Sequence, residues 1–116
     1  ADLAAFVRAL SHSQNIEQRQ MLLEVILLHP KSTSVEVLAS IASRCWQDLK
    51  DDLLLAFLNV LANNEQGQGA FNALVADLMP LPNKRDHILQ AFRSEKRSEE
   101  LMVAIGNLMK SVQQAG

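Results

Sequence analysis

This 116-residue sequence has few of the residues from which metal, redox and nucleotide sites are built. It has one cysteine and three scattered histidines, so it can close no intramolecular disulfide and has no ligand spacing for a structural zinc. Gly67 and Gly69 form a G-x-G pattern, but no predicted strand precedes it and no phosphate-binding Lys, Ser or Thr follows. We therefore expect neither a metal nor another cofactor.

Long apolar runs and aromatic anchors are also scarce. The run at residues 53–58 is far shorter than the roughly 18 residues needed to cross a bilayer, which predicts no membrane span. Tyrosine is absent and there is one tryptophan, Trp46, which we expect to fill a gap between helices. The low cysteine content favours a cytoplasmic or other intracellular compartment. The missing initiator methionine indicates a processed chain or a piece of a longer protein.

Positive charge is distributed unevenly. Residues 51–83 contain no lysine or arginine, although the net charge of the whole chain is only −2. Such a balance disfavours general nucleic-acid binding, which needs a concentrated basic face. Five basic residues then follow within residues 84–97: Lys84, Arg85, Arg93, Lys96 and Arg97. They are candidates for contact with an acidic partner surface or, less favoured, with phosphates, but a solvated connector of mixed charge is the preferred explanation of such a run.

Apolar residues recur every three to four positions along the whole chain, which predicts an all-α protein. We expect six to seven antiparallel helices in one domain, residues 1–116. Their positions are about 2–10, 16–28, 35–46, 49–62, 71–79, 84–92 and 99–112. The helix at 49–62 is apolar on nearly all sides and should be central, with Asp48 as its N-terminal cap.

Between residues 16 and 83 a two-helix unit is written twice, with a spacing of about 33 residues. In this alignment one set of apolar positions, Met21, Leu22, Val25 and Leu28, corresponds to Leu54, Leu55, Leu58 and Leu61. A third pair is shorter. The pattern therefore predicts either a helical bundle or a short α-solenoid-like stack of helix pairs. The period is near that of tetratricopeptide repeats, but the signature positions of that family are not reproduced.

No residues specify a reaction. The adjacent acidic pairs at 51–52 and 99–100 lie in predicted first helical turns, where they oppose the helix dipole. Cys45 falls on an apolar face, as a small buried residue would. No nucleophile, base and orienting group can be placed together, so we predict that the chain is not an enzyme. A polar pocket around His12, His29 or His87 would favour the opposite conclusion.

The leading hypothesis is a protein-interaction module, an adaptor or regulatory domain that binds a partner protein or peptide helix through a groove or exposed apolar strip. The candidate partner-binding residues are the five basic residues of 84–97 together with Met102 and Met109, which lie on the amphipathic last helix. That helix can belong to the core or to an interface. The alternatives are a nucleic-acid-binding domain that uses residues 84–97 and, least favoured, a small helical enzyme. Oligomeric state is not predicted.

Overall fold

The computed structural model describes residues 2–115, and this range forms seven α-helices and two short 3-10 helices without any strand. The all-helical prediction is thus confirmed. The α-helices are α1 (Leu3–Leu10), α2 (Ile16–Leu27), α3 (Val35–Arg44), α4 (Asp51–Leu61), α5 (Gln68–Leu78), α6 (Lys84–Ala91) and α7 (Glu99–Ala115), with the 3-10 helices η1 (Pro30–Thr33) and η2 (Trp46–Asp48). No helix in this range is both long and apolar enough to span a membrane.

Local sequence signals explain where several helices begin and end. The carboxylate of Asp2 accepts the N–H groups of Ala4 and Ala5 at the start of α1. Asn15 accepts the N–H of Gln18 at the start of α2, so a cap satisfies backbone donors that the helix leaves free. Pro30 follows α2 closely and opens η1. Gly67 has φ +84° before α5, a conformation that glycine adopts at little cost.

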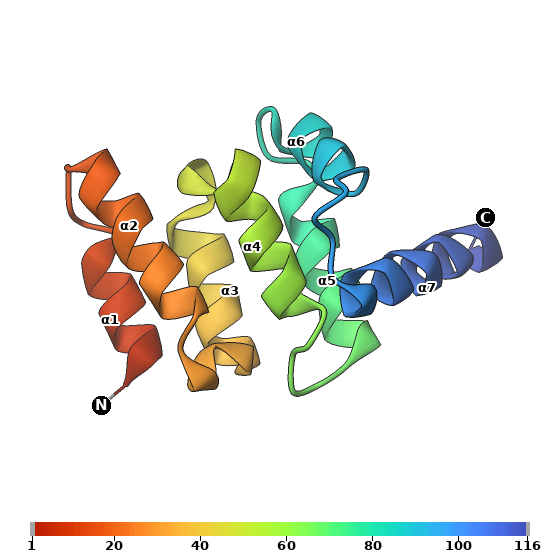
Figure 1. Cartoon of the computed structure of the whole chain (residues 1–116), viewed down its shortest axis with the longest axis horizontal. Helices are drawn as coiled ribbons and strands as arrows, with labels where there is room; N and C mark the ends of the chain where they lie inside the picture. The colour runs from red at the N-terminus through yellow and green to blue at the C-terminus, as the bar shows by residue number, and fades with distance from the viewer. Residues whose placement is uncertain (1, 116) are drawn as a thin grey trace.

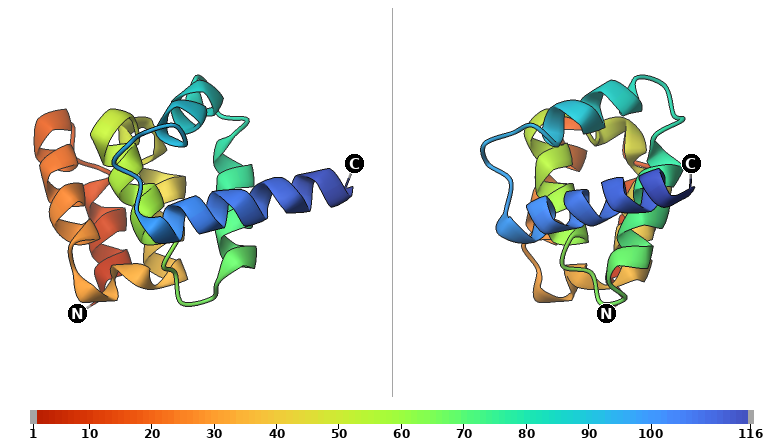
Figure 2. Two further views of the ribbon diagram at one scale, coloured as in Figure 1. Left: turned by 45° about the vertical axis from the view of Figure 1, so that its right-hand side comes forward. Right: turned by 90° about the vertical axis from the view of Figure 1, so that its right-hand side faces the viewer.

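The first six α-helices form two layers. In one layer α1 packs against α3 and α3 against α5, while in the other α2 packs against α4 and α4 against α6. Figure 1 shows the three helix pairs following one another along the longest axis of the molecule. The seventh helix, α7, packs across α4 and α5, and its C-terminal half extends beyond them in the left view of Figure 2.

The centre of the core is α4, as its sequence predicted. Leu54, Phe57, Leu58 and Leu61 are fully buried, because α2, α3, α6 and α7 all pack around this helix. Two neighbouring helices contribute the same i, i+3, i+4 pattern of buried residues, the spacing that places three side chains on one helical face. These trios are Leu23, Ile26 and Leu27 in α2, and Ile88 and Ala91 in α6 with Phe92 at its C-terminal cap.

The expected correspondence between α2 and α4 is wrong in its register. Met21, Val25 and Leu28, which the spacing aligned with buried positions of α4, are exposed. Leu23 instead takes the place of Leu54, two positions later than expected. The error arose because α2 carries apolar residues on opposite sides, so that periodicity alone cannot say which side faces the core.

Candidate functional site

The basic residues of the segment 84–97 do not all lie at the surface. Lys84 is 2% exposed, and its ammonium group donates to the backbone carbonyl of Leu49, the residue that follows η2. Arg85, Arg93 and Lys96 are exposed, and the guanidinium of Arg97 donates to the carbonyl of Ser94 at 2.8 Å. The expectation that Lys84 meets a partner is therefore corrected, because its charged end is already engaged inside the protein.

Lys84, the first residue of α6, links the start of that helix to the turn formed by η2. Its Nζ atom lies 5.9 Å from the centre of the Trp46 ring, within range of a cation–π interaction. Burial lowers the pKa of Lys84, and the nearby charge of Lys50 lowers it further, whereas Asp48 opposes the shift. Trp46 is half-buried and packs against the hydrophobic core, and its ring also lies beside the ammonium group of Lys84.

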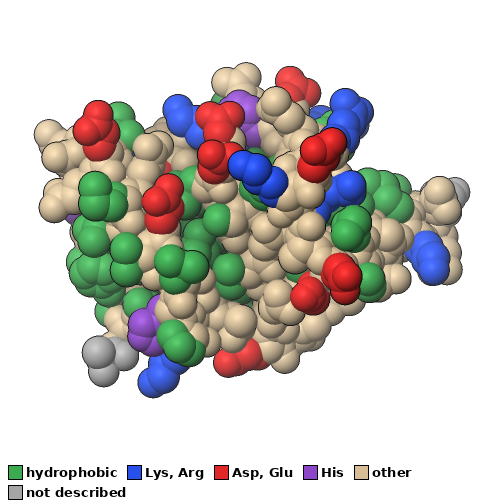
Figure 3. Space-filling view, viewed as in Figure 1, with side chains coloured by type: hydrophobic (Ala, Val, Ile, Leu, Met, Phe, Trp, Pro, Cys, Tyr) green, Lys and Arg blue, Asp and Glu red, His purple; other side chains and the backbone are tan. Residues whose placement is uncertain are grey.

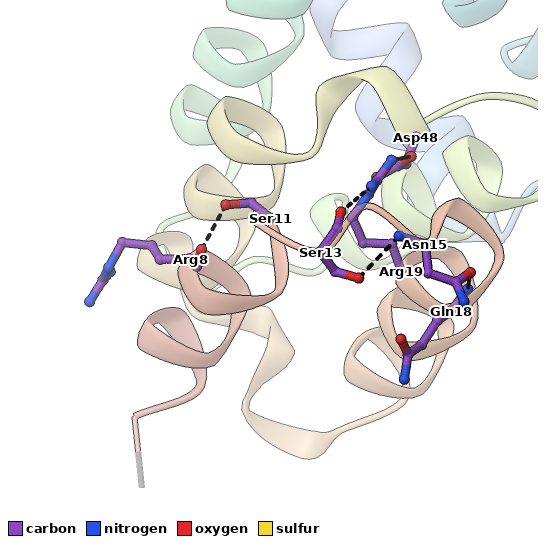
Figure 4. A network of polar contacts seen from close by, with 7 residues as sticks. All are labelled: Arg8, Ser11, Ser13, Asn15, Gln18, Arg19 and Asp48. Carbon is purple, nitrogen blue, oxygen red and sulfur yellow. Dashed lines mark hydrogen bonds and ion pairs between the residues drawn. The ribbon is translucent and has the colours of Figure 1, made fainter.

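The other side of the same turn is held by Arg19 of α2. Its Nε and Nη2 atoms donate to the two carboxylate oxygens of Asp48, and its Nη1 donates to the carbonyl of Ser13 (Figure 4). The expectation that Asp48 caps the following helix is wrong, because Asp48 is buried and paired, and α4 begins at Asp51. The sequence held no local signal for this pair, because its members are 29 residues apart.

Cys45 adjoins this ion pair at the end of α3. Its thiol is buried, as predicted from its place on an apolar face. Burial raises the pKa of Cys45 to about 11, with a further increase from the charge of Asp48 and a partly opposing effect of Arg19. A thiol with so high a pKa is almost entirely protonated at neutral pH, which is unsuited to nucleophilic catalysis.

A polar cleft of about 420 Å³ lies between the start of α4 and α6. In Figure 3 acidic, basic and histidine side chains gather over this junction. It is lined by Asp51, Asp52, Leu55, His87, Gln90, Ala91, Arg93 and Ser94. This is a polar pocket around one of the three histidines, the kind of feature that would favour an enzyme, so the contacts of its polar groups bear on that alternative.

In the described part of the chain, no hydrogen bond at this cleft links His87 to Ser94. The Nδ1 atom of His87 is buried and has no hydrogen-bond partner among the described residues. The hydroxyl of Ser94 accepts the N–H of Lys96 at 3.1 Å, and no hydrogen bond joins it to His87 within residues 2–115. A nucleophile, a base and an orienting group are normally linked by such bonds. Nor does any group of three His, Cys, Asp or Glu in the described range lie where it could hold a metal ion.

An aligned set of exposed apolar side chains lies along α2 and its C-terminal end. Met21, Val25 and Leu28 are 63%, 60% and 85% exposed, and their i, i+4, i+7 spacing aligns them along one side of the helix. We call these three residues the α2 strip. Apolar side chains gather over α1 and α2 in Figure 3, with acidic side chains among them. Phe6 of α1 is also 46% exposed.

The last helix carries the other predicted apolar contact residues. Met102 and Met109 are 45% and 42% exposed, whereas Leu101 and Ala104 of the same helix are buried. The N-terminal half of α7 therefore belongs to the core, and both methionines are accessible. The side-chain amide of Gln68 in α5 donates a hydrogen bond to the carbonyl of Ala104 in α7 at 2.9 Å, which links the two helices.

Comparison with known families adds an assignment. The model of a family described as "Protein of unknown function (DUF3549)" matches residues 1–109. The chain belongs to the DUF3549 family. The match covers α1 to α6 and most of α7. No curated protein and no solved structure matches the chain.

Proposed function

We propose that this DUF3549 chain is a protein-interaction module, an adaptor or regulatory domain, that binds an apolar helix of a partner protein on the α2 strip. The observation that carries the proposal is the exposure of three large apolar side chains on consecutive turns of one helix. Isolated exposed apolar residues are ordinary, but an aligned set is typical of a surface that another helix covers. On this proposal the chain works in an intracellular compartment.

The arrangement of the helices supports this role. We infer that the three helix pairs form a short stack, since helices of each layer contact one another in succession. Stacked helix pairs present extended faces rather than deep pockets, and such faces serve as binding surfaces. The α2 strip lies on the first pair, where no other helix of residues 2–115 covers it.

The charges around the strip indicate what kind of helix fits. Glu17 and Glu24 are exposed on α2, while the guanidinium of Arg19 is occupied by Asp48. A partner helix should therefore combine an apolar stripe with basic residues beside it, since complementary charges favour association. Full burial of an apolar side chain contributes roughly 1.5–3 kcal/mol, so three of them give a modest contact that complementary charges would strengthen.

The proposal can be tested with a matched pair of variants on the same helix. Val25→Glu places a charge within the strip, and Ile16→Glu places the same charge on the opposite side of α2, at a residue that is 56% exposed compared with 60% for Val25. The tagged wild-type chain and both variants are used to capture proteins from extracts of the source cells. A captured protein is then purified, and its affinity is measured by titration calorimetry.

We expect wild-type chain and I16E to bind the same purified protein, and V25E to bind it at least about tenfold more weakly, the effect of losing a central apolar contact. Circular dichroism shows whether both variants retain the helical fold. Equal binding by V25E and wild type would contradict a role for the α2 strip.

A further inference from the structure

The cleft between α4 and α6 combines apolar and acidic lining residues. Leu55 and Ala91, which are 8% and 7% exposed, are its apolar lining residues and form its floor. Asp51 and Asp52 precede Leu55 by four and three residues, so both carboxylates lie one helical turn from it on the surface of α4. A small apolar floor is thus bordered by two negative charges.

The basic group of the cleft comes from the segment that follows α6. Arg93 lines the cleft together with Ser94. Farther along this segment, the side-chain amide of Asn59 in α4 donates to the carbonyl of Lys96 at 3.5 Å, and its oxygen accepts the N–H of Ser98 at 3.0 Å. The backbone that follows Arg93 is therefore tied to the helix that carries the two aspartates, which holds both kinds of charge at one cleft.

The opposite charges of the cleft are not paired with each other. No ion pair among residues 2–115 includes Asp51, Asp52 or Arg93, although all three line the same cleft. The helix dipoles favour acidic residues at the start of α4 and a basic residue after α6, but they leave these side chains without partners. The cleft volume of 420 Å³ lies within the range of about 300–1,000 Å³ that is typical of small-molecule sites.

A ligand that contacts all of these groups has a positive charge, a negative charge and an apolar part. An α-amino acid with an aliphatic side chain carries all three on one carbon atom. We propose that the cleft binds such a free amino acid. Its ammonium group pairs with Asp51 and Asp52, and its carboxylate accepts two N–H groups of Arg93. Its side chain covers the apolar floor of the cleft. This site is separate from the α2 strip, and each can be tested without the other.

Titration of the 116-residue chain with L-leucine, followed by two-dimensional NMR of the backbone amides, tests the proposal. We expect saturable shifts at the amides around the cleft, with a Kd of about 1 mM or tighter. Isoamylamine is L-leucine without its carboxylate, and isocaproate is L-leucine without its ammonium group. Each should bind at least about tenfold more weakly, because each leaves one side of the cleft unpaired.

Two variants test the charged groups of the protein. The double variant Asp51→Asn/Asp52→Asn keeps the shape of both side chains and removes their charges, and Arg93→Gln removes the guanidinium. Each should weaken L-leucine binding at least about tenfold. If the aspartate variant lost its helical circular dichroism signal, the comparison of L-leucine with isoamylamine and isocaproate on the wild type would still decide the proposal.

Matched controls make the same changes of charge away from the cleft. Glu99→Gln/Glu100→Gln removes two adjacent carboxylates from the first turn of α7, and Arg85→Gln removes an exposed arginine of α6 that does not line the cleft. Both should bind L-leucine as the wild type does. V25E should also bind it normally, because the α2 strip lies outside the cleft.

Three results would overturn the amino-acid site. The first is a lack of saturable shifts at L-leucine concentrations up to about 50 mM. The second is equal binding of isoamylamine and L-leucine, since the carboxylate would then not be recognised. The third is an equal loss of binding in the cleft variants and in their matched controls, which would mean that L-leucine responds to net charge rather than to this cleft.

Discussion

The guanidinium of Arg19 donates hydrogen bonds to both carboxylate oxygens of Asp48, with Nε 2.7 Å from Oδ2 and Nη2 2.8 Å from Oδ1. The side chains are 15% and 5% exposed, so this bidentate pair lies largely out of water. A pair in this position is expensive to break, because the remaining partner keeps its charge in a poorly solvated place. It joins α2 to the turn that precedes α4.

Arg19→Met should therefore destabilise the fold by about 3 kcal/mol, close to the range for loss of one partner of a buried ion pair. The measurement is urea unfolding followed by circular dichroism. The double variant Arg19→Met/Asp48→Leu should lose less stability than the sum of the single changes, since it leaves no unpaired charge. Arg8→Met is the control. The Arg8–Asp2 pair is 4.0 Å long and exposed, so this change should cost less than about 1 kcal/mol. Additive effects of the two buried changes would contradict the coupling.

Lys84 allows a comparison of two adjacent basic residues in different surroundings. Lys84→Met keeps most of the side-chain volume but leaves the carbonyl of Leu49 without its donor, which should cost about 1–3 kcal/mol of unfolding free energy. Arg85→Met changes an exposed residue and should alter stability by less than about 0.5 kcal/mol. Chemical unfolding of both variants checks this. Equal effects would mean that Lys84 contributes nothing through its buried contact.

Cys45 should make stability fall in alkaline solution. Its folded-state pKa of about 11 lies above the 9.0 of an unperturbed thiol, so the folded state holds the proton more tightly. The resulting stabilisation is complete below pH 9 and is lost as the pH rises toward 11. We expect the unfolding free energy of the wild type to fall over this interval by about 1–2 kcal/mol more than that of Cys45→Ala. The shift of Lys84 has the opposite sign and cancels in this comparison. Parallel pH profiles would contradict the prediction.

The same pKa predicts slow thiol chemistry. At pH 8 the native protein should contain about 100-fold less thiolate at Cys45 than the unfolded chain, and burial slows access further. Reaction with a chromogenic aromatic disulfide should therefore be slow in buffer and fast in denaturant. Rapid reaction under native conditions would show that the thiol is not enclosed.

Two glycines should respond in opposite ways to alanine. Gly67 has φ +84° and ψ −155° and open space where a Cβ atom would lie, so the cost of Gly67→Ala is that of the backbone conformation alone, about 1–3 kcal/mol. Gly106 lies inside α7, also with open space, and Gly106→Ala should stabilise the helix by about 0.5–1 kcal/mol. Thermal unfolding distinguishes the two, and a shift of both melting temperatures in the same direction would be inconsistent with this account.

Periodicity predicted the helices well, because each of them repeats apolar residues at helical spacing and most end at recognisable signals such as Pro30 or the turn at Gly67. The orientation of α2 could not be predicted in the same way. Its sequence offers Met21, Val25 and Leu28 on one side and Leu23, Ile26 and Leu27 on another, and both sets satisfy the helical period. Only the neighbouring helices decide which set is buried.

The sequence left open whether the last helix belongs to the core or to an interface, and it did not predict the burial of Lys84. A lysine in a run of charged residues usually lies at the surface, and its acceptor, the carbonyl of Leu49, is 35 residues away. Every residue has a backbone carbonyl, so the sequence does not indicate which one a lysine will contact. The partner of Arg19 could not be predicted either, because nothing near residue 19 indicates which distant carboxylate it pairs with.

The turn at residues 45–49 therefore receives one basic side chain from the first helix pair and one from the third, across 29 and 35 residues of sequence. Neither outer pair can separate from the middle of the molecule without exposing a charged group or an unpaired carbonyl of that turn. Unfolding that began at either end would break one of these two contacts with the turn in the middle of the molecule. We expect the three pairs to unfold as one cooperative unit rather than to fray in succession, and amides throughout α2, α4 and α6 to exchange hydrogen with similar free energies of opening.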